Sequence, residues 1–112
     1  MKTTQMQPLL NRKIAFKRSE YQKIPTVAGC YVLSTFQDDV LYIGQAVSLN
    51  RRFLEHLDNP EKTHPTAEGK AFWFHFLEYD TDKIGVLENT WLQTFEMTEG
   101  RLPILNKVHS PG

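Results

Sequence analysis

The chain has 112 residues, the size of a single domain with a modest core, and its composition of 40% hydrophobic and 23% charged residues argues against general disorder. Cys30 is the only cysteine, which excludes an internal disulfide and fits a reducing compartment. No apolar run is long enough to span a membrane and no signal peptide opens the chain, so we expect a soluble, cytoplasmic domain without membrane contact.

The net charge of zero hides an uneven distribution of charge. Residues 1–24 carry six basic residues against Glu20 alone, a charge of +5, and the remainder therefore carries −5. A basic arm on an acidic body is typical of proteins that hold a polyanion with one end, although a solvated terminus without a ligand is equally compatible. We divide the chain into a basic N-terminal segment (1–23), a domain (24–108) and a tail (109–112).

The first elements in chain order are a weakly indicated helix and a hairpin. A short helix is expected around residues 9–16. Residues 30–36 and 40–44 are rich in β-branched and aromatic side chains, and the short polar stretch between them predicts a β-hairpin. Ser48 is an expected N-cap for a helix to about residue 57, on which Leu49, Phe53 and Leu57 form an apolar stripe.

The second half of the chain predicts a loop, a strand and a longer helix. Residues 58–70 contain two prolines and a glycine and are expected to form an exposed loop. Residues 71–79 are aromatic on both alternating faces, which suits a strand covered on both sides. A second helix is expected over residues 82–98 and ends at Gly100. The order β-β-α-β-α predicts an α/β fold, a small three-stranded antiparallel or mixed β-sheet flanked by helices.

Several polar residues occupy positions at or beside the predicted core. Ser48, Arg52 and His56 recur every four residues, which places Arg52 and His56 at the edge of the buried face of the first helix. Glu88 lies within or beside the apolar stripe of the second helix, where an ionised carboxylate is costly unless it is paired or binds a metal. Two interpretations stay open: a buried ion pair with Arg52, or a ligand for a hard cation such as Mg²⁺.

Two tyrosines belong to the predicted hairpin. Tyr31 and Tyr42 fall on the same face of the sheet if the loop is Asp38-Asp39. Strand tyrosines are usually half-buried packing residues, so neither indicates chemistry by itself. His75 on the aromatic strand is more typical of a core histidine, and His64 of a plain loop residue.

Taken together, these residues resemble a known family. Gly29-Cys30-Tyr31 followed by Tyr42-Ile43-Gly44 resembles the two motifs that name the GIY-YIG nucleases. Arg52 lies eight residues past Gly44, as the family arginine does, and His56 follows one helical turn later. Glu88 falls where the family places its metal-binding glutamate, and residues 103–106 resemble the closing segment, which ends in asparagine. The resemblance covers residues 24–107.

Two departures from the family pattern stand out. Cys30 replaces the middle isoleucine of the first motif, a packing position, and we expect little effect. Gln45 follows the second motif where many relatives have lysine, which removes a phosphate contact or a charge that tunes the tyrosine.

The resemblance implies a metal-dependent endonuclease that hydrolyses phosphodiester bonds in DNA with one Mg²⁺ or Mn²⁺ ion. Glu88 would bind the metal, Arg52 would stabilise the phosphoryl oxygens, and Tyr42 would accept the proton of the attacking water. Tyr31 and His56 would orient the water or relay its proton, although the two tyrosine roles could be exchanged. Asn106 would fix the active-site backbone or a tyrosine hydroxyl. The expected DNA contacts are Gly44, Gln45, Ser48, Arg51, Lys17, Arg18 and Lys107.

Other functions remain compatible with the sequence. The domain could be a nuclease subunit targeted by a separate DNA-recognition protein, or it could cut both strands as a homodimer. It could also be a non-catalytic nucleic-acid-binding module of the same fold, or an interaction domain in which Glu88 and Arg52 form only an ion pair. The type of DNA and the biological role are not indicated.

Overall fold

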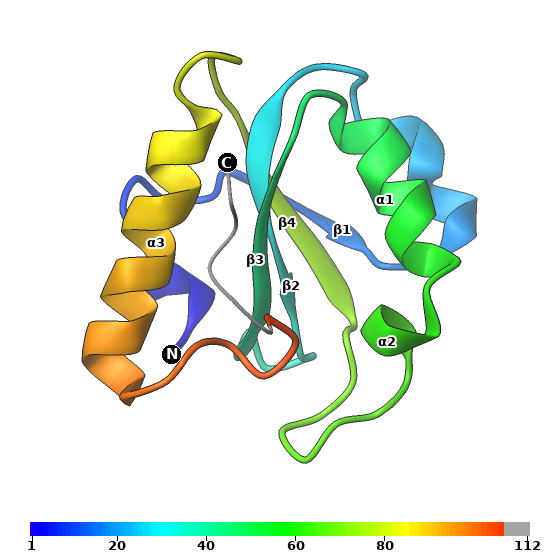
Figure 1. Ribbon diagram of the computed structural model, residues 1–112. Helices are drawn as coiled ribbons and strands as arrows, with labels where there is room; N and C mark the ends of the chain where they lie inside the picture. The colour runs from blue at the N-terminus through cyan, green and yellow to red at the C-terminus, as the bar shows by residue number, and fades with distance from the viewer. Residues whose placement is uncertain (107–112) are drawn as a thin grey trace.

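The computed structural model describes residues 1–106 of the chain, in which a four-stranded sheet lies between helices (Figure 1). In chain order the elements are η1 (Thr3–Gln5), β1 (Arg12–Ala15), η2 (Arg18–Lys23), β2 (Gly29–Ser34), β3 (Val40–Ala46), α1 (Leu49–Leu57), α2 (Pro60–Thr63), β4 (Trp73–Glu78) and α3 (Ile84–Glu99). No helix in this part of the chain has both the length and the apolar character needed to cross a bilayer.

The sheet is antiparallel throughout, with the strand order β1-β4-β2-β3. The predicted α/β class, the hairpin of β2 and β3, and the strand over β4 are confirmed, but the sheet has one strand more than expected. The helix expected around residues 9–16 is wrong, because Arg12–Ala15 forms β1 and pairs with β4. Without β1, the backbone of β4 would lack a partner along one edge, which pairing satisfies.

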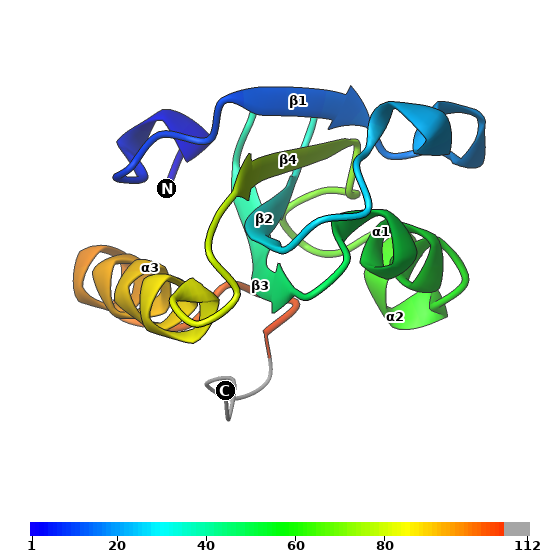
Figure 2. The same cartoon turned by 90° about the horizontal axis from the view of Figure 1, so that it is seen from above.

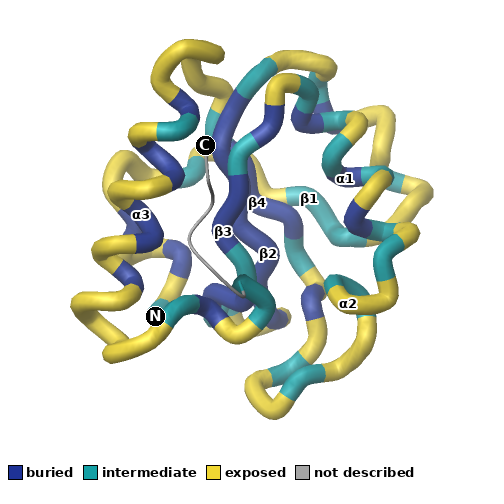
Figure 3. The backbone as a smooth tube through the Cα atoms, in the orientation of Figure 1, coloured by how far each residue is buried: buried dark blue, intermediate teal, exposed yellow. Residues whose placement is uncertain are grey.

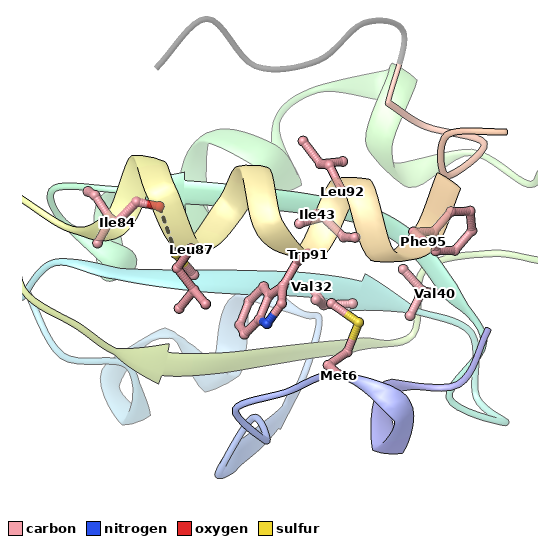
Figure 4. Close-up of a cluster of buried hydrophobic side chains, with 10 residues drawn as sticks. Met6, Val32, Val40, Ile43, Ile84, Leu87, Trp91, Leu92 and Phe95 are labelled. Atoms are coloured by element: carbon pink, nitrogen blue, oxygen red, sulfur yellow. Dashed lines mark hydrogen bonds between the residues drawn. The ribbon is translucent and has the colours of Figure 1, made fainter. Parts of the chain in front are cut away.

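The sheet separates two apolar cores, and seen from above the helices lie on opposite sides of it (Figure 2). α3 covers one face, where Trp91, Leu92 and Phe95 pack with Val32 and Ile43 (Figure 4). α1 covers the other face with its apolar stripe; the buried residues there include Tyr31, Leu41, Leu49, Phe53, Phe74 and Phe76. Buried residues follow the central strands and the inner sides of both helices (Figure 3). β3, at one edge of the sheet, is therefore flanked by a helix on each face.

The helix ends carry the signals that the sequence predicts. The Ser48 side chain accepts a hydrogen bond from the Arg51 backbone N–H, which confirms it as the N-cap of α1. Gly100 ends α3 in the left-handed conformation, with φ of 77°, which a residue without Cβ adopts at low cost. The expectation of a loop over residues 58–70 missed α2, where the Asn59 side chain caps the Glu61 N–H and Pro60 occupies the first helical position.

The basic N-terminal segment is packed into the fold. Met6 lies in the α3 core with no exposed surface, and β1 forms the second edge of the sheet. Four of its basic side chains form ion pairs, namely Lys2–Asp39, Lys13–Asp38, Arg18–Asp58 and Lys23–Glu20. Three of these carboxylates belong to the acidic remainder of the chain, so part of the charge asymmetry is neutralised internally. A contribution of this segment to DNA affinity stays a prediction.

Candidate active site

The alternation of side chains along β3 brings residues from both faces of the sheet to one edge. Tyr42 packs against the α1 core, whereas Gln45 pairs in register with Cys30, which belongs to the α3 core. A cleft of about 270 Å³ opens across this edge between α1 and α3. Its lining residues are Tyr42, Gln45, Ala46, Val47, Arg52, Ile84 and Glu88. The cleft thus unites three residues that the sequence predicts for chemistry, from three different elements.

Tyr31 lies behind the cleft, entirely buried beneath α1. Its ring stacks on Phe74 with the centroids 5.0 Å apart, and its hydroxyl lies 2.5 Å from Nε2 of His56. Burial raises the pKa of the phenol well above its ordinary value. The two predicted tyrosines do share one face, since the rings of Tyr31 and Tyr42 are 6.0 Å apart.

Gly44 is explained by this buried tyrosine. A Cβ placed on Gly44 would lie 2.5 Å from both Cζ and the hydroxyl oxygen of Tyr31, closer than carbon and oxygen atoms can approach. Only a residue without a side chain leaves room for the phenol end of Tyr31 at this point of β3. The glycine of the second motif and the tyrosine of the first are therefore a matched pair, and Gly44 has a structural role besides any contact with DNA.

His56 in the last turn of α1 is buried and neutral at physiological pH. Burial lowers the pKa of the imidazole to about 3, and the positive charges of Lys62 and Arg52 add to the effect. Because the Tyr31 phenol is also uncharged, the contact between them is a hydrogen bond between two neutral groups. Moving a proton from the phenol to the imidazole would create a buried ion pair, so this contact holds the two groups in place in their neutral forms.

Tyr42 is the tyrosine that reaches the cleft. It is half-buried, and its pKa is raised by burial and further by the negative charge of Glu88, while Tyr31 and Arg52 act in the opposite direction. The Lys62 ammonium lies 4.8 Å from the centroid of the Tyr42 ring, in a cation–π contact. Lys62 was not predicted as a site residue, although Asn59-Pro60 is a helix-start signal that would have indicated an ordered segment here.

Arg52 connects α1 to β3 at the rim of the cleft. Its Nη1 donates to the backbone oxygen of Gln45 at 3.3 Å, and its Nε donates to Glu55 at 3.0 Å. Arg51 also approaches Glu55, at 3.9 Å, but points to solvent. The hydrogen bonds to Gln45 and Glu55 hold the Arg52 guanidinium group at the rim of the cleft.

Glu88 is the buried carboxylate of the site, with 4% of its surface exposed. Its Oε1 accepts a hydrogen bond of 3.3 Å from Nε2 of Gln45. Gln45 therefore contacts Arg52 through its backbone and Glu88 through its side chain. No set of three or more His, Cys, Asp or Glu side chains within residues 1–106 could enclose a metal ion, so a cation here would depend on Glu88 with water or substrate oxygens.

Asn106 takes the first of the two roles expected for it. Its Oδ1 accepts from the backbone N–H of Ile43 at 2.9 Å, and its Nδ2 donates to the backbone oxygen of the same residue at 3.0 Å. These two bonds complete the free edge of β3 between Tyr42 and Gly44. Asn106 thereby fixes the strand segment that positions Tyr42.

The remaining predicted residues lie apart from the cleft or outside the description. Lys17 and Arg18 lie beyond the end of β1, where Arg18 pairs with Asp58, and Arg51 is exposed on α1. Lys107 lies outside the described residues. His75 is a core histidine, as expected: it lies 2.8 Å from the Ser34 hydroxyl, and burial lowers its pKa to about 4. His64 is exposed.

The cleft residues lie within a stretch of the chain that matches a known family. The model of the GIY-YIG catalytic domain matches residues 27–100, which include the cleft residues and the core of both helices. The chain belongs to the GIY-YIG family. The expectation from the two tyrosine motifs is therefore confirmed, and the chain carries a nuclease domain of the GIY-YIG type.

The similar curated proteins share one name. The chain is similar to the UvrABC system protein C of Syntrophomonas wolfei, with 25% identity over 70% of the chain and 14% of that protein. It is 33% identical to the same protein of Finegoldia magna over 45% of the chain and 8% of the relative. The match to that of Alkaliphilus metalliredigens is 23% over 55% of the chain and 10% of the relative. The chain thus spans a small fraction of the length of these relatives.

Proposed function

We propose that this GIY-YIG domain is an endonuclease that hydrolyses phosphodiester bonds in DNA with one divalent cation. The observation that carries the proposal is the meeting of a phenol, a guanidinium and a buried carboxylate in one cleft at the sheet edge, from Tyr42, Arg52 and Glu88. These are the groups needed to deprotonate water, stabilise a phosphoryl transition state and hold a cation.

Glu88 fits Mg²⁺ or Mn²⁺ by its chemistry and position. It is a hard oxygen donor, almost fully buried yet lining an open cleft, and Gln45 orients one of its oxygens. A single protein carboxylate suits Mg²⁺, which keeps several waters and takes substrate phosphate oxygens as further ligands. A bound cation would polarise the scissile phosphate, stabilise the leaving 3′ oxygen and offset the Glu88 charge that raises the pKa of Tyr42.

The protein side chains then divide the remaining work. Arg52 presents guanidinium N–H donors to the phosphoryl oxygens as negative charge builds on them. Tyr42, half-buried in the cleft, accepts the proton of the attacking water as a phenolate, the form that Arg52 and a bound cation would favour, whereas Tyr31 is enclosed and reaches water only through its neighbours. Tyr31 and neutral His56, joined by their 2.5 Å contact, orient the neighbouring Tyr42. Asn106 keeps the Tyr42 segment of β3 in register.

In this proposal the domain cleaves the DNA, while other DNA contacts or a partner protein select the target. The cleft is small, and the chain spans 14% or less of the curated relatives it matches. A larger protein or a partner protein that delivers the DNA is thus a second form of the same function, in which the isolated domain cuts slowly and with little sequence preference.

The test is incubation of the purified chain with single-stranded, duplex and branched DNA of one sequence, each with Mg²⁺, Mn²⁺ or EDTA. We expect products with a divalent cation and none with EDTA. Cleavage that persists in EDTA would remove the cation from the mechanism. Binding of DNA without cleavage under any metal condition would instead support the non-catalytic module.

A further inference from the structure

A second hollow lies where β1 ends and β4 begins, away from the active-site cleft. It has a volume of about 280 Å³ and is lined by Ala15, Phe16, Lys17, Lys70, Ala71 and Phe72. The Phe16 N–H donates to the Phe72 backbone oxygen at 2.8 Å, which joins its two walls. None of these residues lines the cleft that holds Tyr42 and Glu88. This hollow has no part in the proposed cleavage reaction.

Exposed aromatic rings border the hollow. Phe72 is 45% exposed and Phe36 is 59% exposed, and their rings meet edge to face with the centroids 4.9 Å apart. Phe36 also stacks on Trp73 at 6.2 Å, and the Trp73 indole N–H donates to the Phe36 backbone oxygen at 3.1 Å. Apolar rings held at the surface in this way leave apolar faces and edges that water covers at a cost.

Two lysines flank these rings without a matching carboxylate. Lys17 and Lys70 are exposed on opposite walls of the hollow, and neither forms an ion pair with a carboxylate of residues 1–106. Lys23 and, less strongly, the positive charge of Lys17 lower the pKa of Glu20, but the Glu20 carboxylate forms its ion pair with Lys23, with 2.7 Å between Oε2 and Nζ. Lys2, Lys13 and Arg18, in contrast, are each paired with an aspartate. The hollow therefore combines an apolar floor with uncompensated positive charge.

We propose that this hollow binds an unpaired nucleotide of the DNA, with the base stacked on the ring of Phe72, the neighbouring ring of Phe36 against its edge, and the adjoining phosphates beside Lys17 and Lys70. Aromatic surfaces between cations are the features that bind single strands, because every base has a face to stack and every nucleotide a charge to neutralise. Bases within a duplex already stack on each other and offer no free face. The inference rests on the proposed nuclease function and adds a substrate class, DNA with a single-stranded segment.

The position of the hollow relative to the active site is consistent with one DNA ligand. The segment between α1 and β4 carries both Lys62, which lies over the Tyr42 ring, and Lys70, at the rim of the hollow. In Figure 1 this segment runs from α2 to the start of β4, next to the end of β1. A strand held at the hollow would continue along the outside of this segment toward the cleft.

The test is binding of a fluorescein-labelled single strand and of its duplex, by fluorescence anisotropy in EDTA so that nothing is cut. Phe36→Ala/Phe72→Ala should weaken single-strand binding on the order of tenfold and change duplex binding little. Lys17→Gln/Lys70→Gln should lower the salt dependence of single-strand affinity by a slope of about 1.4, since each phosphate contact contributes about 0.7. The matched controls are Val86→Ala/Met97→Ala on the exposed face of α3 and Lys83→Gln at its N-cap, which should change neither quantity.

Binding should also quench Trp73, which stacks on Phe36, while a Trp73→Phe variant loses the signal because Trp91 is buried in the other core. Equal losses on single strand and duplex, or no loss with the aromatic double variant, would overturn the proposal. If the wild-type chain is a dimer and the aromatic double variant is a monomer with unchanged DNA affinity, the surface binds protein instead. If the chain cuts DNA but the variants bind normally, only this inference fails; if it binds through the hollow but does not cut, only the nuclease proposal fails.

Discussion

The side-chain amide of Gln45 donates to Oε1 of Glu88 at 3.3 Å, while the backbone oxygen of Gln45 accepts from Arg52 at 3.3 Å. One residue at the edge of the sheet thus links the carboxylate on α3 to the guanidinium on α1. The group that Gln45 presents to Glu88 is a neutral donor. Residue 45 therefore orients Glu88 without adding a positive charge that would compete with a metal ion for this carboxylate.

Replacing Gln45 with leucine should weaken cation binding rather than abolish the chemistry. Loss of the amide removes the donor that orients Glu88, and groups that orient metal ligands contribute about 10- to 100-fold in metal affinity. We expect the Mg²⁺ concentration for half-maximal cleavage to rise by about tenfold, with the rate at saturating Mg²⁺ changed less. Gln93→Leu on the exposed side of α3 is the control. A lower saturating rate with unchanged Mg²⁺ dependence would contradict this role.

Replacing Glu88 with glutamine should abolish metal-dependent cleavage without unfolding the chain. The amide keeps the shape of the carboxylate and can still pair with Gln45, but it lacks the charge that a divalent cation requires. Cleavage rates with Mg²⁺ and Mn²⁺ should fall to the EDTA level, while the circular dichroism spectrum stays that of the wild type. Glu96→Gln, exposed on the same helix, should cut normally. Unchanged cleavage by the Glu88 variant would remove the one-metal mechanism.

Much of the fold and the site could be predicted, because their signals are local. The hairpin, the Ser48 cap and the apolar stripes of α1 and α3 are set by short-range patterns, and Gly44 follows from the motif. β1 could not be predicted, since a strand of four residues, from Arg12 to Ala15, is ordered by pairing with β4 far along the chain. The Lys62 contact likewise depends on how α2 folds back over Tyr42, which no local pattern of residues specifies.

Replacing Gly44 with alanine should destabilise the domain through Tyr31. The new Cβ would lie 2.5 Å from the buried hydroxyl and Cζ, so the ring must move against Phe74 and His56. Overpacking of this kind costs about 1–3 kcal/mol, measured as the loss in unfolding free energy in urea. In a Tyr31→Leu background the same substitution should cost less, because the opposing atoms are gone. Equal costs in both backgrounds would show that the clash with Tyr31 is not the cause.

Acidification should destabilise the domain between about pH 6.5 and 4 through its two buried histidines. The pKa of His56 is lowered to about 3 and that of His75 to about 4, both from an ordinary value of 6.5. In this window the unfolded chain binds more protons than the folded one. The contribution of the two histidines to the unfolding free energy is therefore fully present above pH 6.5 and is lost as the pH falls toward their folded-state pKa values. Each histidine should account for about 2 kcal/mol between pH 7 and 4.5.

Urea unfolding at these two pH values measures the effect. His75→Gln should reduce the difference, whereas His64→Gln, at an exposed position, should leave it unchanged. His56→Gln should reduce it as well, and it also removes the imidazole partner of Tyr31. An unaltered pH dependence in both buried-site variants would assign the acid sensitivity to other groups.

Replacing Lys62 with methionine should change the charges around His56 and Tyr42 together. The ammonium of Lys62 is the second cause, after burial, of the lowered pKa of His56, and it lies over the Tyr42 ring. Without it, we expect the pKa of His56 to rise. We also expect the Tyr42 phenol to be harder to deprotonate, which would shift the pH–rate profile of cleavage to higher pH. The His56 imidazole signals in NMR titration and the pH dependence of cleavage measure the two effects. Lys62→Arg should restore both because it keeps the cation, and a rate loss that arginine does not restore would assign Lys62 a purely structural role.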